Sequence, residues 1–251
     1  MHQPLRVRVL SDLHLNHRTW KAPDVPADVV MLAGDVTSGL EGIRWARSVF
    51  KDTPIVYVAG NQEFYGYNID ELVPELRRVA SEHDVHFLEQ EVLYMSGVRI
   101  LGATLWTDFN LFGNQKIWLG KDEVRADRPA ERKGILTNAG VFTPAAMLDR
   151  HNSTLRWLKS ELDRDFDGKT IVMTHHVPTR QGLPALWRDD LSSAAFASHL
   201  DVLFSHVDVW ICGHTHTAAD FQAGRCRVVI NPRGRTIGSR NGFNPELVLE
   251  I

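Results

Sequence analysis

Acidic, amide and imidazole side chains follow five short apolar runs of the sequence, at the point where each run ends. In chain order they are Asp12 and His14, Asp35, Asn61, His175 and His176, and His214 and His216. Carboxylates, amide oxygens and imidazoles without a thiolate favour hard to borderline divalent metals such as Mn, Fe, Zn, Co or Mg. The pattern therefore predicts a metal site built from residues far apart in the chain.

Each residue also has an ordinary structural explanation, because an Asp after a strand often caps a helix and a single His often only satisfies a loop. Five such ends in one chain favour the chemical interpretation. The donors other than His176 exceed what one tetrahedral site takes. They suit two ions about 3.5–4 Å apart if a carboxylate bridges them, which would hold a hydroxide and clamp the oxygens of an in-line phosphoryl displacement.

The runs that must position these donors are short and rich in β-branched residues, as in buried strands. Predicted strands are Leu5–Leu10, Val29–Ala33, Ile55–Ala59, Thr170–Thr174 and Val207–Cys212, and predicted helical regions are Gly39–Phe50, Asp70–His83, Pro144–Arg164 and Ser192–Ser205. Strands that alternate with helices indicate an α/β layered fold. In open α/β sheets, ligands bind at the carboxyl ends of the strands, where these donors fall.

Three shorter β-like runs, Arg99–Gly102, Arg227–Ile230 and Leu247–Ile251, predict a second sheet or an antiparallel edge. Glycines stand directly before three of the donors, at Gly34, Gly60 and Gly213, where a side chain would obstruct a close backbone approach. Five other histidines lie in or beside the helical patterns and are expected to be surface or capping residues rather than ligands, namely His83, His86, His151, His199 and His206.

The composition is that of an ordinary globular protein, with 43% hydrophobic and 24% charged residues. No linker-like stretch divides the 251 residues, so we expect one domain over residues 1–251. Two cysteines and the lack of a signal-like or membrane-length apolar run predict a cytoplasmic protein without a membrane partner. A net charge of −3 argues against long nucleic acid as a partner.

The stretch over about residues 104–142 fits neither a helical nor a strand period. It contains Trp106, Phe109, Phe112 and Trp118 among several basic residues, and segments of this kind in compact domains are often functional. We expect an ordered, cap-like segment that shapes the substrate pocket, whose aromatic rings could stack a nucleobase. The alternatives are a mobile surface excursion, or aromatic rings that only pack the core.

The order of these residues resembles the calcineurin-like metallophosphoesterase superfamily. The motifs that carry the resemblance are Asp12-x-His14, Gly34-Asp35, Gly60-Asn61-x-Glu63, Thr174-His175-His176 and Gly213-His214-x-His216. Together they are highly specific and span most of the chain. Two weaker matches, Thr104–Phe109 and Asn231–Gly234, are similar to small bacterial phosphohydrolases of that superfamily.

The resemblance implies an α/β fold, a four-layer sandwich of two mixed β-sheets flanked by helices. It also implies two divalent ions, with Mn²⁺ favoured, and a hydroxide between them that attacks phosphorus without a covalent enzyme intermediate. Asp12, His14 and His216 would hold the first ion, Asn61, His175 and His214 the second, and Asp35 would bridge the two. Asn61, Gln62, His176 and Arg233 would act on a small phosphoester or nucleotide-like substrate.

Gln62 departs from the family pattern, in which a histidine usually follows the asparagine and assists the leaving oxygen. Glutamine can donate a hydrogen bond but cannot give up a proton, and general acid catalysis is typically worth about 10²–10⁴ in rate. Esters with poor leaving groups should therefore suffer most, which favours phosphodiester or activated phosphoester substrates.

Three interpretations of Gln62 are open at this point. In the first it is natural, and the enzyme prefers good leaving groups or diesters, or borrows a proton donor such as His176 or His17. In the second it is an engineered change that disables catalysis to trap substrate. In the third the chain keeps its metals but works by binding rather than catalysis. A separate alternative is a scaffold protein that binds metal weakly or not at all, which would predict degraded ligand motifs, whereas all seven donor positions are present here.

Overall fold

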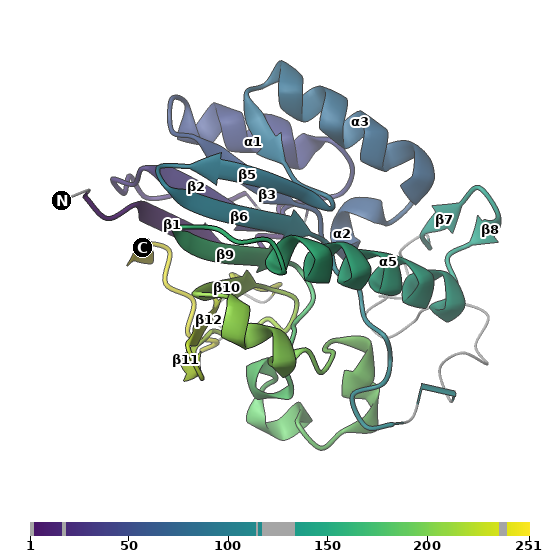
Figure 1. Cartoon of the computed structure of the whole chain (residues 1–251). Coiled ribbons are helices and arrows are strands. Elements are labelled where there is room, and N and C mark those ends of the chain that lie inside the picture. Colours follow the sequence, from purple (N-terminus) through teal and green to yellow (C-terminus); the bar gives the residue numbers. More distant parts are fainter. Residues whose placement is uncertain (1–2, 17–18, 114, 117–133, 236–239) are drawn as a thin grey trace.

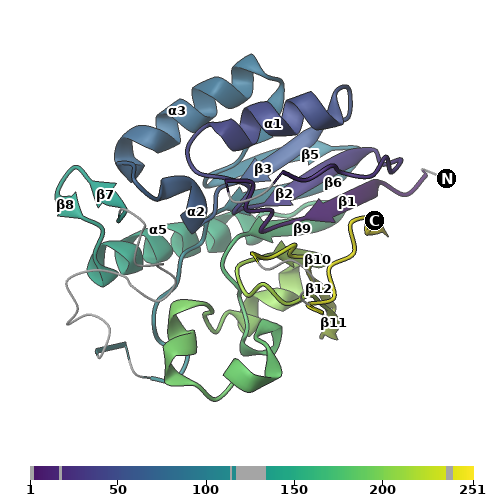
Figure 2. The ribbon, with the colours of Figure 1, turned by 180° about the vertical axis from the view of Figure 1, so that it is seen from behind.

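The computed structural model describes residues 3–16, 19–113, 115–116, 134–235 and 240–251. Two β-sheets pack face to face, with helices over their outer faces (Figure 1). The view from behind shows the same layers, with α1 and α3 over one sheet (Figure 2). The fold is thus the expected α/β sandwich of two mixed sheets flanked by helices.

The first sheet has five strands in the order β13-β1-β2-β3-β4. Its parallel members are β1 (Arg6–Leu10), β2 (Val29–Ala33), β3 (Ile55–Val58) and β4 (Val85–Phe87). The last strand, β13 (Val248–Glu250), pairs antiparallel with β1 and supplies the antiparallel edge that the run at 247–251 predicts.

The second sheet has six strands in the order β11-β12-β10-β9-β6-β5. The four inner strands are parallel: β12 (Cys226–Ile230), β10 (Val209–Cys212), β9 (Lys169–Thr174) and β6 (Val98–Ala103). The edges, β11 (Ala219–Ala223) and β5 (Glu91–Met95), are antiparallel. Both outcomes that the short β-like runs predict, a second sheet and an antiparallel edge, therefore occur.

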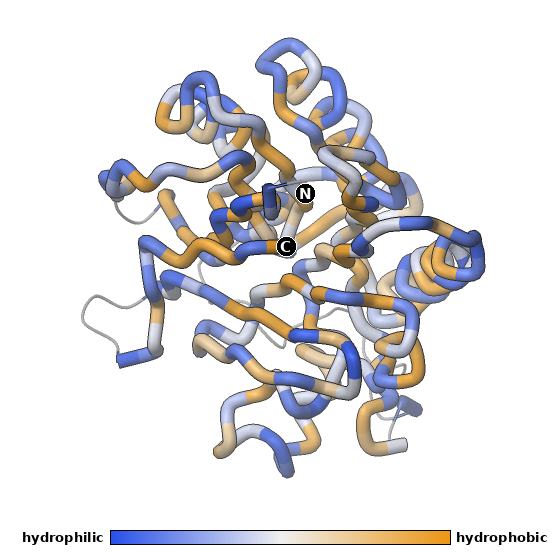
Figure 3. The backbone as a smooth tube through the Cα atoms, turned by 60° about the vertical axis from the view of Figure 1, so that its left-hand side comes forward, coloured by the Kyte–Doolittle hydropathy of each residue, from blue (hydrophilic) through white to orange (hydrophobic). Residues whose placement is uncertain are grey.

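Alternating residues of the inner strands pack into different layers, which explains why a strand such as β2 (VVMLA) is apolar throughout. In β2, Val29 and Met31 pack between the two sheets, whereas Val30 and Leu32 pack beneath the helices. The helices over the first sheet are α1 (Glu41–Phe50) and α3 (Ile69–Glu82), and α5 (Pro144–Leu162) lies on the second. Figure 3 shows these apolar segments running through the interior and hydrophilic loops outside.

The predicted helix over Ser192–Ser205 is wrong. The chain there forms two short 3₁₀ helices, η3 (Leu191–Ala195) and η4 (Asp201–His206), separated by an extended segment. Backbone bonds to the segment after β9 explain the break: Val177 N–H donates to the Phe196 carbonyl, and Ser198 N–H donates to the Val177 carbonyl, 3.0 Å away. Those groups are therefore unavailable for helical hydrogen bonds.

Part of the segment over 104–142, including Trp118, lies outside the described residues. Its described portion contains a small hairpin, β7 (Leu136–Thr137) and β8 (Gly140–Val141). Trp106 and Phe109 are buried in the core, so these two rings pack the interior and are not open to stack a base. None of the described helices combines the length and apolar character that a membrane crossing needs.

Candidate metal centre

Both sheets contribute to one cluster of side chains at the carboxyl ends of their parallel strands. From the first sheet come Asp12 and His14 after β1, Asp35 after β2, and Asn61, which begins the short helix α2 (Asn61–Phe64) after β3. From the second come His175 after β9, and His214 and His216 after β10. The edges meet where Ser11 N–H donates to the Asn231 carbonyl and Arg233 N–H to the Ser11 carbonyl.

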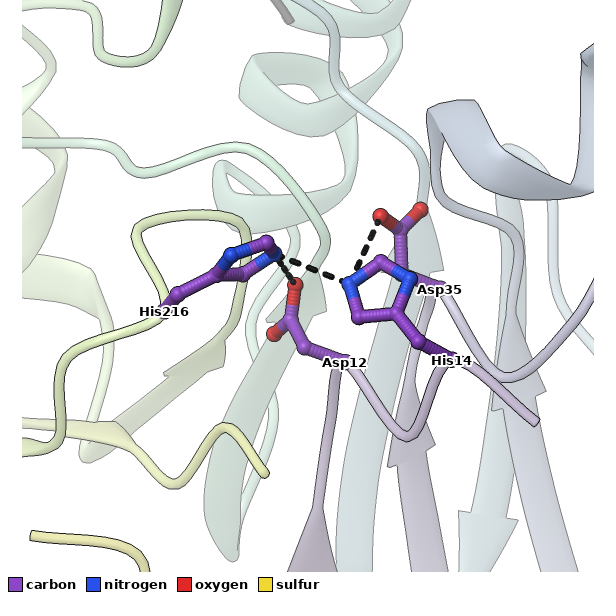
Figure 4. Close-up of side chains that lie close together, drawn as sticks. All are labelled: Asp12, His14, Asp35 and His216. Carbon is purple, nitrogen blue, oxygen red and sulfur yellow. Dashed lines mark hydrogen bonds and ion pairs between the residues drawn. The ribbon is translucent and has the colours of Figure 1, made fainter. Parts of the chain in front are cut away.

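Four of these side chains form the group drawn in Figure 4: Asp12, His14, Asp35 and His216. One ligand atom from each lies within 4.8 Å of all the others. The Nε2 atoms of His14 and His216 are 2.9 Å apart, and His216 Nε2 is 3.3 Å from Asp12 Oδ1. Converging imidazole nitrogens and carboxylate oxygens fit a divalent cation.

A second group gathers around His175 Nε2, which lies 3.0 Å from Asn61 Oδ1 and 3.1 Å from His214 Nδ1. Asp35 is common to the two groups. Its Oδ1 lies 3.3 Å from His175 Nε2, and its Oδ2 lies 3.7 Å from His14 Nε2. Each oxygen of this carboxylate thus faces one set of donors.

Hydrogen bonds orient the donor atoms toward the centre. His175 Nδ1–H donates to the Ala33 carbonyl at 2.9 Å, which leaves Nε2 to act as a ligand. Asn61 Nδ2 donates to the hydroxyl of Tyr65 at 3.2 Å, so its Oδ1 faces His175. Ser11 Oγ donates to Asp12 Oδ2 at 2.6 Å. Such supporting bonds fix ligand geometry before metal binds.

The backbone around the centre is strained. Five donors have φ in the left-handed region that favours glycine, namely Asp12 (51°), His14 (47°), Asp35 (56°), His214 (72°) and His216 (53°). Non-glycine residues of this kind cluster at functional sites. Their concentration here supports the metal-site interpretation independently of residue type.

Three glycines permit the close approach of the ligand loops, as the sequence predicts. A Cβ atom on Gly60 would lie 2.2 Å from Asp35 Oδ1, and one on Gly213 would lie 2.6 Å from Asp12 Oδ2. At Gly34, where φ is +81°, a Cβ atom would lie 2.5 Å from His175 Nδ1. No side chain fits at these positions without displacing a donor.

Burial sets the protonation of the histidines. It lowers the pKa of His214 and of His176 well below the ordinary value, and the positive charge of neighbouring imidazoles acts in the same direction. Burial alone would raise the pKa of Asp12, but its hydrogen bond to His216 and the charges of His216, His175 and His14 outweigh it and lower the pKa. His214 thus favours the neutral imidazole and Asp12 the ionised carboxylate, the forms that bind metal.

Glu63 is a buried carboxylate beneath the centre. In the sequence it stands out only as the last residue of the Gly60-Asn61-x-Glu63 motif. It accepts hydrogen bonds from the Asp35, Val36 and Gly60 N–H groups and from Tyr57 Oη, all at 2.7–3.0 Å. Burial and the charge of Asp35 raise the pKa of Glu63 to about 7. Glu63 stands three positions after Gly60, the N-cap of α2, and an acidic residue at that spacing is a helix-start signal. This signal could have indicated that Glu63 holds the backbone at the start of α2.

Gln62 is buried beside Asp35, and its backbone N–H donates to Asp35 Oδ1 at 2.7 Å. Its side-chain Nε2 donates to Ser38 Oγ at 2.8 Å, and Asn16 Nδ2 donates to the same hydroxyl at 2.8 Å. Ser38 is not indicated by the sequence pattern, because it lies in the loop after β2 and meets the α2 residue Gln62 only through tertiary structure. His17, the other candidate proton donor, lies outside the described residues.

His176 packs beside the second group. Its ring centroid lies 4.2 Å from that of His214 and 5.2 Å from that of Trp106, and its backbone N–H donates to the Thr104 carbonyl. The predicted role of His176 toward phosphate remains a prediction.

Arg233 lies against the loop that carries Asp12 and His14. Its guanidinium donates to the Leu13 carbonyl at 2.7 Å and sits 5.8 Å from the centroid of the Trp20 ring. The next residue, Gly234, donates its N–H to the Asp12 carbonyl at 3.0 Å. Arg233 therefore contacts the ligand loop, and its predicted contact with phosphate is a separate proposal.

His151 corrects an expectation about the other histidines. His83 caps α3 as expected, with Nδ1 2.9 Å from the Val79 carbonyl, but His151 on α5 is buried beneath the segment after β6. Burial lowers the pKa of His151, against the charge of Asp108 and the nearby backbone of Trp106. In the long amphipathic helix predicted over 144–164, the sequence pattern does not show whether His151 faces the core or the solvent, which explains the error.

A sequence profile described as calcineurin-like phosphoesterase matches residues 5–218. The chain belongs to the calcineurin-like phosphoesterase family. The match covers every strand end that contributes a donor, and the donor cluster indicates that the family's metal-binding function is retained. Comparison with curated protein sequences finds no match.

Solved structures confirm the fold. The chain resembles a phosphopantetheinyl hydrolase from Mycobacterium tuberculosis with a TM-score of 0.74 and 17% identity. The match covers 100% of the present chain and 96% of the hydrolase. A 5'-nucleotidase from Staphylococcus aureus matches with a TM-score of 0.51 and 13% identity, over 91% of this chain but only 49% of the nucleotidase.

Proposed function

We propose that this chain is a binuclear-metal hydrolase of phosphoester bonds, with Mn²⁺ a suitable metal and Fe, Zn, Co or Mg alternatives. The observation that carries the proposal is the position of Asp35, whose two oxygens face different sets of donors. Asp12, His14 and His216 would hold one ion and Asn61, His175 and His214 the other. A carboxylate shared between two ligand sets suits a metal pair better than two independent sites.

When bound, the two ions would lower the pKa of a shared water and neutralise charge on the phosphoryl oxygens. The protein's own contribution is preorganisation. Glu63 fixes the backbone N–H of Asp35 and Gly60, and the Ala33 carbonyl fixes the His175 ring, so the donors need not rearrange during reaction. His176 and Arg233 are the proposed phosphate contacts.

Gln62 supports a substrate with a phosphodiester or activated leaving group. Its amide is held by Ser38 and can donate a hydrogen bond toward the leaving oxygen, but it cannot transfer a proton to it. A stable leaving anion requires no such proton. The assay should also include an alkyl ester of the kind that the name of the structurally similar phosphopantetheinyl hydrolase describes.

A catalytically disabled metal-binding or scaffold protein is the second candidate, favoured by the absence of a histidine at position 62. The convergence of all seven donors and their supporting hydrogen bonds argues against a scaffold that has lost its metals, and turnover separates the enzyme from a disabled metal-binding protein. A cytoplasmic location and a small phosphoester or nucleotide-like substrate stay predictions alongside it.

The proposal is tested by loading the protein with Mn²⁺ and measuring rates on p-nitrophenyl phosphate and bis(p-nitrophenyl) phosphate, each with and without chelator. We expect chelator-sensitive turnover that favours the diester. Protein that binds metal but turns over neither ester, even with Gln62→His, would contradict the enzyme and support the scaffold.

A further inference from the structure

An aromatic series runs from the metal centre to the molecular surface. The Phe196 ring lies 4.9 Å from the ring of the ligand His214, and the Trp187 ring lies 5.6 Å from Phe196. Phe196 is half-buried, and Trp187, at the end of η2 (Ala185–Trp187), is 38% exposed. The surface formed by Trp187 and Phe196, here the aromatic platform, is therefore continuous with a donor of the proposed metal site.

Exposed apolar residues concentrate at this platform. Among the described residues, eight large apolar side chains are exposed, and three of them, Leu186, Trp187 and Leu191, fall within one short stretch. Exposed apolar residues that gather in this way often mark a binding site. The 4.9 Å separation of the Phe196 and His214 rings places the platform beside the candidate metal centre.

The turn that carries Trp187 is braced by polar contacts. Arg188 Nε donates to the Leu183 carbonyl at 3.1 Å, and Arg180 Nε donates to the Arg188 carbonyl at 2.7 Å. Ser193 Oγ donates to the Trp187 carbonyl at 2.8 Å. A braced turn holds the indole in place before a ligand arrives, which lowers the entropic cost of binding.

Resting on the proposed function, we propose that the aromatic platform binds a planar aromatic group of the phosphoester substrate. Offset or tilted stacking on Trp187 and Phe196 would seat an aryl or nucleobase group while the phosphoryl group lies at the metal centre. Flat rings gain stacking energy on indole and phenyl faces, whereas a saturated ring of similar size gains only apolar contact. The platform thus selects the ester group rather than the phosphate.

The test is equilibrium binding to Mn²⁺-loaded protein, measured by calorimetry with three phosphonates that cannot be hydrolysed. They are methylphosphonate, 2-phenylethylphosphonate and 2-cyclohexylethylphosphonate. The wild-type protein should bind the phenyl compound roughly threefold to tenfold more tightly than the cyclohexyl compound, because a stacked aromatic pair is worth about 0.5–1.5 kcal/mol beyond its buried area.

Trp187→Ala should abolish the phenyl preference and leave methylphosphonate binding unchanged, and Trp187→Phe should retain part of the preference. Tyr94→Ala, which removes an exposed ring on the β5 edge, is the matched control and should behave as wild type. Equal affinities of the wild-type protein for the phenyl and cyclohexyl compounds, or an unchanged preference in Trp187→Ala, would overturn the proposal.

Methylphosphonate separates this inference from the proposed function. Metal-dependent binding of methylphosphonate without a phenyl preference would leave the hydrolase proposal intact and reject the platform. Failure of all three phosphonates to bind Mn²⁺-loaded protein would contradict both.

Discussion

Gln62 occupies the position at which the family usually has a histidine, and Ser38 fixes its amide beside Asp35. A histidine there can protonate a leaving alkoxide, which glutamine cannot do. We therefore expect Gln62→His to raise kcat for alkyl phosphomonoesters by about 10²-fold, the low end of general acid catalysis, and to change aryl diester rates much less. Steady-state kinetics at saturating Mn²⁺ measures the effect.

The matched control is Gln222→His, the same exchange at an exposed position on β11. It should leave every rate unchanged. A monoesterase kcat that does not respond to Gln62→His would show that acid assistance is not what this position limits.

His176 gives a pH-dependent prediction for the metal-free protein. The folded chain holds this buried imidazole neutral, whereas the unfolded chain protonates it below its ordinary pKa of 6.5. The unfolded state therefore binds more protons as the pH falls, and stability due to neutral His176 is lost below pH 6.5. Relative to His176→Gln, the wild-type protein should lose up to about 2 kcal/mol between pH 6.5 and 5.

Urea unfolding of both proteins across that pH range provides the measurement. Because Glu63, with its raised pKa, is present in both, its opposite contribution cancels in the difference. The exposed His86 gives the control variant His86→Gln. Burial of a neutral ring would be contradicted if the difference in unfolding free energy between wild type and His176→Gln stayed constant with pH. It would also be contradicted if that difference changed with pH only as much as the difference between wild type and His86→Gln.

At the scale of elements, the turns after the strands decide whether donors converge. Gly34 and Gly97 share a positive φ, +81° and +76°, but a Cβ atom on Gly34 would strike His175 whereas one on Gly97 meets nothing within 4 Å. Gly97→Ala should therefore cost about 1–2 kcal/mol of stability and leave metal affinity unchanged. Gly34→Ala should also weaken Mn²⁺ binding by roughly 10–100-fold, the typical effect of disturbing a ligand's support.

Calorimetric titration of both variants with Mn²⁺ checks this comparison. Equal affinities in the two alanine variants would mean that the turn after β2 does not position His175.

The elements also mark how far the sequence could predict the site. Donors at strand ends were predictable because parallel strands deliver their carboxyl ends to one edge. The Gln62–Ser38 contact was not, since it joins the helix α2 to the loop after β2 through tertiary packing. The segment Ser192–Ser205 is predicted as a helix by its apolar spacing, yet its backbone pairs with Val177, a tertiary contact that local spacing cannot reveal.

At the scale of the whole molecule, the centre exists only because two sheets pack together. The first sheet supplies Asp12, His14, Asp35 and Asn61, and the second supplies His175, His214 and His216. The short apolar runs predicted a second sheet or an antiparallel edge, and the family resemblance implied two sheets, but neither indicated which residues would lie between them. That assignment depends on strand order, which alternating side chains do not encode.

The most direct test of the proposed binuclear centre is a titration of metal-free protein with Mn²⁺ at a protein concentration far above Kd, recording the rate of bis(p-nitrophenyl) phosphate hydrolysis. The account predicts a rate that rises until two equivalents per chain and then levels off. A plateau at one equivalent, or no metal-dependent rate at any ratio, would contradict it.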